Sequence, residues 1–293
     1  VGKKIFFKGR EVVVEALDSY DFSRAEITIF TAGSEIAKNW APEASKKTTV
    51  IDNSSYFRMK KDIPLVVPEV NVKDLKSHKN IIANPNCSTI QMVLVLKPLH
   101  DEYKINRVVV STYQAVSGAG KESVEELFSQ TKDYLDEKKI ISKNFTKQIA
   151  FNIIPQIDAF SENGYTKEEI KMMNETKKIL DPNINVTATC VRVPVKTSHS
   201  ESLNIEFENT YDLEKIKKIL SKAPGCKVVD EPKDGGYITP IDSEGNYTTY
   251  ISRIRKDNSN VKAINLWVVS DNLLKGAALN TIQIAEALVE NKN

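Results

Sequence analysis

The sequence has few of the residues that most often carry metal or redox chemistry. Its 293 residues include only three histidines and three cysteines, and the cysteines Cys87, Cys190 and Cys226 lie far apart. An odd number of cysteines at wide spacing fits neither a disulfide framework nor a zinc site. We therefore expect reduced thiols and no metal centre.

The chain also lacks an excess of one charge and any long apolar run. It has 41 basic and 39 acidic residues, a formal charge of +2. Lysines are scattered without interleaved aromatic residues, which argues against a nucleic-acid partner. No apolar run reaches the roughly 18 to 20 residues that cross a membrane, and the first residues do not resemble a signal peptide. These features predict a cytoplasmic protein, long enough for two domains.

The Gly-x-Gly-x-x-Gly dinucleotide fingerprint is absent as well, which argues against a complete Rossmann half. The first ninety residues nevertheless alternate short apolar strands with helical segments, and the strands are expected at 27–30, 49–51 and 65–67. This alternation predicts a parallel α/β sheet. The polar loops 31–34 and 52–55 follow the carboxyl ends of strands, where cofactors bind in such sheets, or they are ordinary turns.

The remainder of the chain has a different pattern. Long β-rich segments alternate with helical segments, and this pattern predicts a mixed sheet with helices on one face. The strands are expected at 108–113, 186–195, 203–207 and 264–269, and the helices at 122–137, 167–180, 213–222 and 276–290.

Cys87 lies between a short apolar strand, Ile81–Ala83, and an apolar helical stretch, Ile90–Leu96. This order places the thiol at a helix N-terminus, where free N–H groups and the helix dipole favour a thiolate. The pattern predicts a nucleophile, although a single cysteine also serves as core packing.

A nucleophile of this kind needs a proton shuttle and groups that fix the substrate. His199 follows a strand that carries Arg192, whereas His78 and His100 have surface-like or structural surroundings. A guanidinium within an apolar strand needs an anionic partner, either a substrate group or a structural carboxylate. The small residues of 115–120 suit either a tight turn or close backbone approach to a flat or phosphorylated ligand.

Several long ungapped motifs point to one family. They are Asp52–Met59, Val66–Asn71, Ala83–Gln91, Ser111–Gly120, Cys190–Ser200 and Asn265–Trp267. Together these segments resemble the bacterial aspartate-β-semialdehyde dehydrogenases, and the resemblance extends over essentially the whole chain.

The resemblance implies an α/β fold like that of glyceraldehyde-3-phosphate dehydrogenase. An incomplete Rossmann-like NADP-binding domain is expected from residues 1–87 and 272–293, and an α+β catalytic and dimerisation domain with a mixed sheet from 88–271. Members of the family use NADPH to reduce L-aspartyl-4-phosphate to L-aspartate 4-semialdehyde and release phosphate. This step leads to lysine through diaminopimelate, and to threonine and methionine. A homodimer without nucleic-acid or membrane partners is implied.

The resemblance also implies roles for individual residues. Cys87 matches the nucleophile that forms a thioester, and His199 matches the acid/base catalyst, acting as a cation. Gln114 matches the residue that orients the substrate, and Arg192 the one that holds its α-carboxylate. The other matches are Arg58, Asn86, Glu168 and Lys171 for substrate and phosphate, and Ser117, Gly118 and Asn280 for the nicotinamide cofactor.

The start of the chain departs from the family pattern. Family members begin with a strand, a glycine-rich turn and a helix, followed by a polar stretch that contacts the 2′-phosphate of NADP, and Val1 aligns after all of these. By comparison with a first βαβ unit, about 35 to 40 residues are expected to precede it. We therefore expect poor NADPH binding and slow turnover from this chain.

Two other interpretations stay open. One is a catalytically silent fragment or a dimer-forming scaffold of the same fold. The other is a neighbouring acyl-phosphate or aldehyde reductase, such as N-acetyl-glutamyl-phosphate reductase or glyceraldehyde-3-phosphate dehydrogenase. Those enzymes share the pairing of cysteine with histidine, but their nucleophile motifs differ from Asn84–Thr89.

Overall fold

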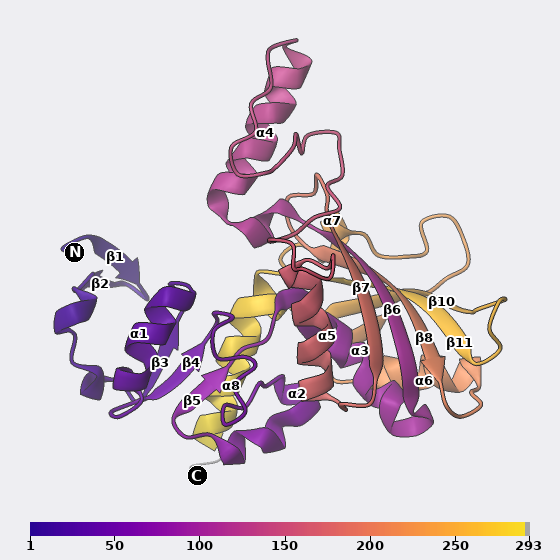
Figure 1. Cartoon of the computed structure of the whole chain (residues 1–293), viewed down its shortest axis with the longest axis horizontal. Helices are drawn as coiled ribbons and strands as arrows, with labels where there is room; N and C mark the ends of the chain where they lie inside the picture. The colour runs from indigo at the N-terminus through magenta and orange to yellow at the C-terminus, as the bar shows by residue number, and fades with distance from the viewer. Residues whose placement is uncertain (291–293) are drawn as a thin grey trace.

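The computed structural model describes residues 1–290, which form two sheet regions joined by a long buried helix, α3 (Cys87–Tyr103) (Figure 1). The last three residues of the predicted segment 272–293 lie outside the described residues. Within residues 1–290, no helix is both long enough and apolar enough to span a membrane.

The first region is a parallel sheet of three strands in the order β3-β4-β5 (Ile27–Phe30, Thr49–Asp52 and Ile81–Ala83). Helices cover both faces because neighbouring strand residues point to opposite sides. Val50 packs with α1 (Ser34–Ala44) on one face, whereas Ile51 packs with α8 (Leu279–Glu290) on the other. The strands predicted at 27–30 and 49–51 are confirmed.

The strand predicted at 65–67 is wrong. Leu65 makes only an isolated bridge to Ala83, and the segment then enters the short helix α2 (Pro68–Asn71). Pro64 and Pro68 flank the three residues, and a proline cannot donate to a strand ladder. A short apolar run between two prolines therefore becomes an extended linker in the core.

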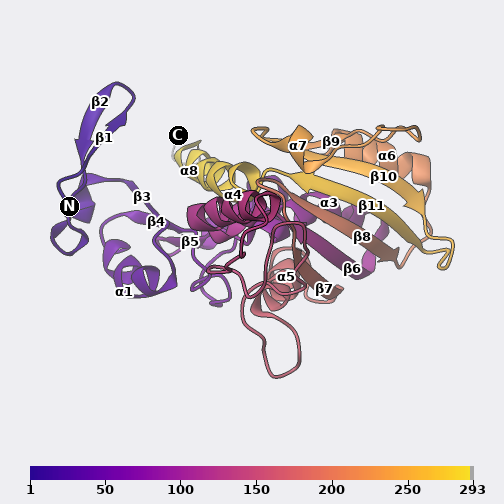
Figure 2. The ribbon, with the colours of Figure 1, turned by 90° about the horizontal axis from the view of Figure 1, so that it is seen from above.

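The chain begins with a hairpin of β1 (Lys4–Phe7) and β2 (Arg10–Val13), at the end of the molecule away from the larger sheet (Figure 2). Lys8 and Gly9 both have positive φ angles, of 47° and 75°, as a two-residue hairpin turn requires. All residues of both strands are exposed.

The second region is a mixed sheet, as the sequence predicted, but it has six strands rather than the expected four. Its order is β7-β6-β8-β11-β10-β9. The outer pairs β6/β7 and β9/β10 are parallel, and the inner pairs are antiparallel. The strands are β6 (Ile105–Gln114), β7 (Asn185–Arg192), β8 (His199–Phe207), β9 (Cys226–Val228), β10 (Thr249–Lys256) and β11 (Ala263–Ser270).

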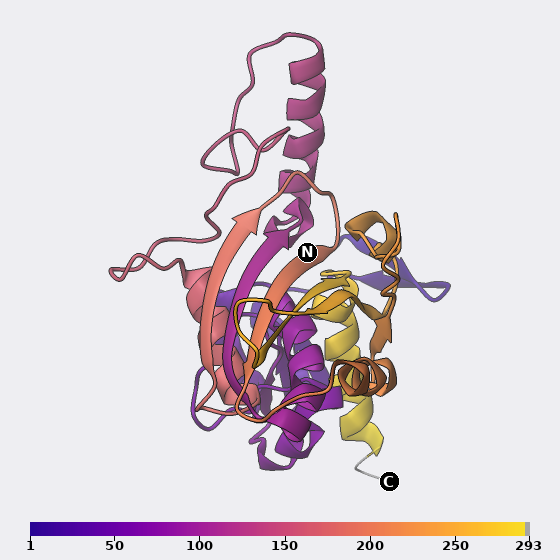
Figure 3. The ribbon, with the colours of Figure 1, turned by 90° about the vertical axis from the view of Figure 1, so that its right-hand side faces the viewer.

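One face of this sheet carries the main core. Helices α3, α5 (Lys167–Ile179) and α6 (Leu213–Lys222) pack there against alternate strand residues such as Leu203 and Ile205. On the opposite face Tyr113 and Trp267 lie side by side, with ring centroids 5.4 Å apart. Helix α4 (Lys121–Leu135) projects away from both sheets as an arm (Figure 3).

The remaining elements are short. They are α7 (Pro240–Ser243), the π-helix Leu274–Ala278, and the 3-10 helices Leu17–Ser19, Phe22–Arg24, Val72–Ser77 and Val116–Ala119.

Candidate active site

A cleft of about 550 Å³ opens where the carboxyl ends of the parallel strands meet the N-terminus of α3. It brings together most of the residues that the sequence singled out. Its lining includes Arg58, Asn86, Cys87, Gln114, Ser117, Gly118, Glu168, Lys171 and Arg192, with Gly33, Ser34, Asn53 and Ser55 from the first sheet. His199 and Asn280 are fully buried behind this lining.

Cys87 is the first residue of α3, as predicted. Asn86 caps the helix, because its side-chain Oδ1 accepts hydrogen bonds from Ser88 N (3.0 Å) and Thr89 N (3.2 Å). The other side of Cys87 is closed by the π-helix, where a Cβ added to Gly276 would lie 2.8 Å from the Cβ of Cys87. Only glycine lets the backbone approach the nucleophile this closely.

Burial opposes the thiolate that the helix N-terminus favours at Cys87. Burial raises the pKa of the Cys87 thiol to about 12, and the Glu168 carboxylate adds to this effect. The charges of Arg58 and Arg192 act in the opposite direction but do not outweigh it. Desolvation at this buried helix end is therefore stronger than the stabilisation of an anion at the N-terminus.

His199 lies directly behind Gly118, since a Cβ added to this glycine would be 3.1 Å from Nε2 of the imidazole. Ala115 N–H donates a hydrogen bond to its Nδ1 (3.0 Å), which assigns the ring proton to Nε2. Burial, together with the charge of Arg192, holds the pKa of His199 well below its usual range. The expected cation is thus replaced by a neutral imidazole, because a second ring proton would face the Ala115 N–H.

Arg192 ends β7 and is buried at the floor of the cleft. Its Nη1 donates to the Ala115 carbonyl (2.7 Å). No carboxylate of residues 1–290 lies within ion-pair distance of this guanidinium, which leaves its other N–H groups for a ligand. Gln114 ends the neighbouring strand β6 and donates from Nε2 to Glu168 (3.2 Å).

Glu168 joins several of these side chains at the start of α5. Its Oε1 also accepts from Asn86 Nδ2 (2.8 Å), and its Oε2 lies 3.3 Å from the Lys171 ammonium. Lys171 in turn pairs with Asp158 (2.9 Å). Burial lowers the pKa of Lys171, but the two carboxylates outweigh burial and the net pKa is raised. The lysine is therefore a fixed cation at the cleft wall.

Arg58 supplies a second cation from the loop after β4. Its Nε donates to Asn84 O (2.9 Å), its Nη2 to Asn53 O (3.0 Å), and its Nη1 pairs with Glu175 (3.1 Å). The guanidinium is thereby fixed in the cleft wall near the start of α3. The cleft thus combines a nucleophile with two arginines and a lysine, which suits a substrate that carries more than one negative charge.

Comparisons with known proteins assign this site to a family. The chain matches the family descriptions "Semialdehyde dehydrogenase, NAD binding domain" over residues 1–78 and "Semialdehyde dehydrogenase, dimerisation domain" over residues 96–275. It is 51% identical to the aspartate-semialdehyde dehydrogenase of Bacillus subtilis, over 98% of this chain and 86% of the relative. The chain belongs to the aspartate-semialdehyde dehydrogenase family.

Other relatives of the family agree in sequence and in structure. The enzyme of Aquifex aeolicus is 51% identical over 99% of this chain and 87% of its own length. The crystal structure of aspartate semialdehyde dehydrogenase II from Vibrio cholerae superposes with a TM-score of 0.96 at 46% identity, over 99% of this chain and 87% of that one. The chain is therefore an oxidoreductase, with a Rossmann-like NAD(P)-binding domain and a dimerisation domain.

The side of the cleft formed by the first sheet fits the nicotinamide cofactor of this family. Gly33, the residue before α1, has a φ of 89°, and no side chain caps the helix. No atom lies within 4 Å of the position that a Cβ on Gly33 would occupy, so the space before α1 is open. The free N–H groups of the first turn of α1 face this end of the helix, which is a suitable place for a phosphate group. Ser117, Gly118 and Asn272 line the end near Cys87 and would hold the nicotinamide end.

Asn280 has a different position from the other predicted cofactor residues of the family. Its Nδ2 donates to Val66 O (3.0 Å) and to Asn84 Oδ1 (2.7 Å), and its Oδ1 accepts from the Lys275 ammonium (3.1 Å). It lies beneath the cleft and joins α8 to the first sheet. Its contact with the cofactor stays a prediction.

Sequence reasoning missed three residues that support the site in this member of the family. Glu175 pairs with Arg58, Asn272 accepts from Ser117 Oγ (3.1 Å), and Lys275 is buried against Glu69 (2.8 Å). Of these three, only Glu175 could have been found from the sequence, because it lies seven residues after Glu168 and therefore on the same face of the helix predicted at 167–180.

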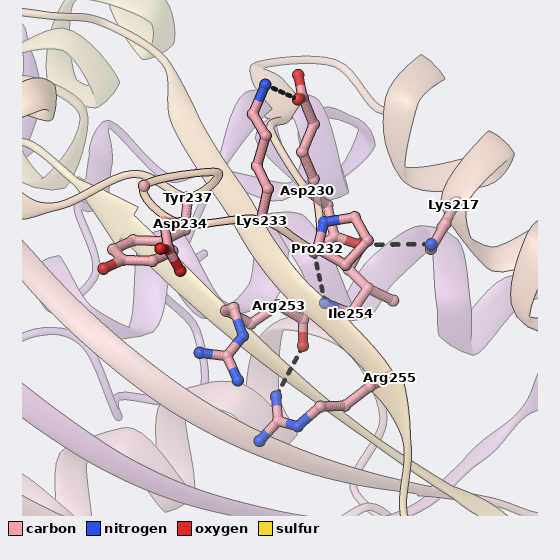
Figure 4. Close-up of a pocket in the computed structure, with 11 residues that line it drawn as sticks. Lys217, Asp230, Pro232, Lys233, Asp234, Tyr237, Arg253, Ile254 and Arg255 are labelled. Carbon is pink, nitrogen blue, oxygen red and sulfur yellow. Dashed lines mark hydrogen bonds and ion pairs between the residues drawn. The ribbon is translucent and has the colours of Figure 1, made fainter.

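A second hollow, of about 600 Å³, lies beside β10 (Figure 4). Arg253 and Arg255 enter it, and Arg255 Nη1 donates to the Arg253 carbonyl (2.7 Å). Lys217 lies 3.5 Å from Asp230, and Lys233 pairs with Glu231. The described residues that line this hollow include no cysteine or histidine, whereas the cleft at α3 contains Cys87.

Proposed function

We propose that this chain catalyses the NADPH-dependent reductive dephosphorylation of L-aspartyl-4-phosphate to L-aspartate 4-semialdehyde, through a thioester on Cys87. The observation that carries the proposal is that Cys87, at the N-terminus of α3, shares one cleft with the cations of Arg58, Lys171 and Arg192. The family to which the chain belongs supports the same reaction. The product would feed lysine, threonine and methionine biosynthesis.

The charges of the cleft match those of the substrate. The α-carboxylate would bind Arg192, whose planar fork has free N–H groups. The α-ammonium would pair with the Glu168 carboxylate. The Gln114 amide, which lies beside Glu168, would orient the substrate. Arg58 and Lys171 would bind the phosphate and stabilise its charge as it leaves.

The first half of the reaction forms the thioester. Cys87 Sγ attacks the carbonyl carbon, the bond from that carbon to the phosphate oxygen breaks, and the thiol proton leaves with the phosphate. The raised pKa of Cys87 supports transfer of a proton during attack rather than a preformed thiolate. Pairing of Glu168 with the substrate ammonium would remove one of the charges that raise this pKa.

The second half reduces the thioester. Bound NADPH supplies a hydride to the thioester carbon. The hemithioacetal on Cys87 then takes up a proton and collapses to the aldehyde and the free thiol. His199 carries its ring proton on Nε2, beside Gly118 of the cleft lining, and we propose that this group stabilises the oxyanion that forms in both halves.

The chain would work as a homodimer. The family description of residues 96–275 names a dimerisation domain, and the face of the six-stranded sheet opposite the helices is available for a second copy. Tyr113 on this face is 37% exposed and its ring lies against that of Trp267 at a tilt of 46°, and aromatic residues are enriched at interfaces.

The reaction can be tested in the oxidative direction. Aspartate semialdehyde and NADP are mixed with the chain, and NADPH formation is followed with and without inorganic phosphate. We expect NADPH formation that depends on phosphate and is lost when Cys87 is alkylated. Absence of turnover at any phosphate concentration would support the silent-scaffold interpretation instead.

A further inference from the structure

Helix α5 carries a stripe of charged residues that extends beyond the substrate site. Glu168, Lys171, Glu175 and Lys178 are spaced three or four residues apart, which places them on one face of the helix. Glu168 and Lys171 line the cleft, whereas Glu175 and Lys178 do not. The mechanism above gives no role to this second pair.

Glu175 uses both carboxylate oxygens to hold parts of the catalytic cleft. Its Oε1 accepts from Arg58 Nη1 (3.1 Å), and its Oε2 accepts from the backbone N–H of Asn86 (2.7 Å). The side chain is only 1% exposed. One buried carboxylate therefore fixes both the phosphate-side guanidinium and the residue that precedes the nucleophile.

Lys178 holds the same arginine through its backbone. The ammonium donates to the carbonyls of Arg58 (2.7 Å), Lys60 (2.8 Å) and Ile63 (2.7 Å). Its N–H donors are thus all used, and they fix the loop 58–63 to the side of α5. Arg58 is consequently held at both ends, at the carbonyl by Lys178 and at the guanidinium by Glu175.

Stability alone is a weak explanation for this arrangement. A buried ion pair loses much of its Coulomb energy to desolvation, and apolar residues of similar size often give equal stability. The ion pair between Arg58 and Glu175 does, however, hold the guanidinium in one orientation, which apolar residues could not do. The guanidinium still has N–H groups beyond those bonded to Asn53, Asn84 and Glu175, and these can serve an anion in the cleft.

We propose that Glu175 and Lys178 are positioning residues that set Arg58 for the phosphate of the substrate. The proposal rests on the proposed function, because it assigns the second half of the α5 stripe to the phosphate subsite of that reaction. It predicts that changes at either residue weaken phosphate binding without weakening binding of the amino-acid part of the substrate.

The first test is Glu175→Gln in the phosphate-dependent oxidation of aspartate semialdehyde. A glutamine has one acceptor oxygen, so its NH₂ group must face either Arg58 or the Asn86 N–H. We expect the KM for inorganic phosphate to rise about tenfold and the KM for aspartate semialdehyde to change less than about twofold. Equal changes in both KM values would overturn the proposal.

The second test is Lys178→Met, with Lys177→Met as its matched control. Lys177 is the neighbouring residue on another face of α5 and does not line the cleft. We expect a rise of about fivefold in the phosphate KM for Lys178→Met and none for the control. The same effect from both variants would overturn the positioning role. This test also stands if Glu175→Gln fails to fold.

A double-mutant cycle separates positioning from a general effect. In an Arg58→Ala background, Glu175→Gln should add almost nothing to the phosphate KM, because the group that it positions is gone. Full additivity of the two changes would contradict the proposal.

A readout without turnover separates this proposal from the proposed function. Iodoacetamide alkylation of Cys87 is measured at increasing concentrations of inorganic phosphate. We expect phosphate to protect the unmodified chain and Glu175→Gln to need about tenfold more phosphate for the same protection. If the unmodified chain is protected but never oxidises aspartate semialdehyde, the proposed function fails while the positioning role survives. Identical protection of the two proteins would overturn the positioning role.

Discussion

The two sides of the cleft are built differently. On the side of the six-stranded sheet, long side chains from strand ends and from α5 are tied to one another, as Glu168 is to Asn86, Gln114 and Lys171. Beside the start of α1, on the side of the three-stranded sheet, the lining is made of small residues, Gly33, Ser34 and Ser55, and a hydrogen bond joins Ser34 Oγ to Ser55 Oγ (3.1 Å).

This difference separates two kinds of recognition. A small substrate with several charges needs charged groups at fixed places, and a bonded network provides them. A long cofactor can bind through backbone N–H groups and small residues that leave space. We therefore expect single substitutions in the charged network, which includes Arg58 from the loop after β4, to have large effects and those among the small residues beside α1 to have small ones.

The largest effect is expected at Cys87, where the two sides meet. Cys87→Ala removes the atom that forms the thioester, so phosphate-dependent NADPH formation should fall by about 10⁴-fold or more. Thermal unfolding with and without phosphate should show that the variant still folds and binds the anion. Activity above one per cent of the unmodified chain would exclude the covalent route.

The next largest effect is expected at His199. Asparagine can still accept the Ala115 N–H but lacks the Nε2–H group, so His199→Asn should lower kcat by about 10² to 10³-fold. Glutamine places an N–H group near the position of Nε2, and His199→Gln should recover part of this loss. Equal kcat values for the two variants would contradict the oxyanion role.

The reactivity of Cys87 should depend strongly on pH. Only the thiolate is alkylated, and a pKa of about 12 keeps the thiolate fraction small at neutral pH. The fraction rises about tenfold per pH unit below the pKa, so the alkylation rate should increase about 100-fold between pH 7 and pH 9. A plateau near pH 7 would show that the helix N-terminus does produce a thiolate. Cys190, which is fully buried, should react more slowly throughout.

The smallest effect is expected on the three-stranded side. Ser55→Ala removes the hydrogen bond to Ser34 but leaves the N–H groups of α1 in place. The KM for NADP should change by no more than about threefold, because an exposed neutral hydrogen bond contributes about 1 kcal/mol or less. A tenfold rise would mean that side chains on this side matter as much as those opposite, and the comparison between the two sides would not hold.

Local signals in the sequence predicted much of this architecture. The alternation of strands and helices gave the parallel sheet, and the long β-rich runs gave the mixed sheet. The order of strand, Asn86, Cys87 and apolar helix gave the position of the nucleophile, because helix capping depends only on neighbouring residues.

Properties that depend on distant residues could not be predicted in this way. The pKa of Cys87 is raised by burial and by Glu168, and the ring proton of His199 is placed by Ala115, which directly follows β6. The pairing of Glu175 with Arg58 joins residues more than a hundred positions apart. Such contacts follow from the fold, and no local pattern indicates them.

The most direct test of the account is to isolate the thioester. The chain is incubated with aspartate semialdehyde and NADP in the absence of phosphate, digested at low pH and analysed by mass spectrometry, before and after phosphate is added. We predict an aspartyl group on the peptide that contains Cys87, and its loss as aspartyl phosphate when phosphate is present. An adduct on the Cys190 or Cys226 peptide, or NADPH formation with no adduct at Cys87, would contradict the account.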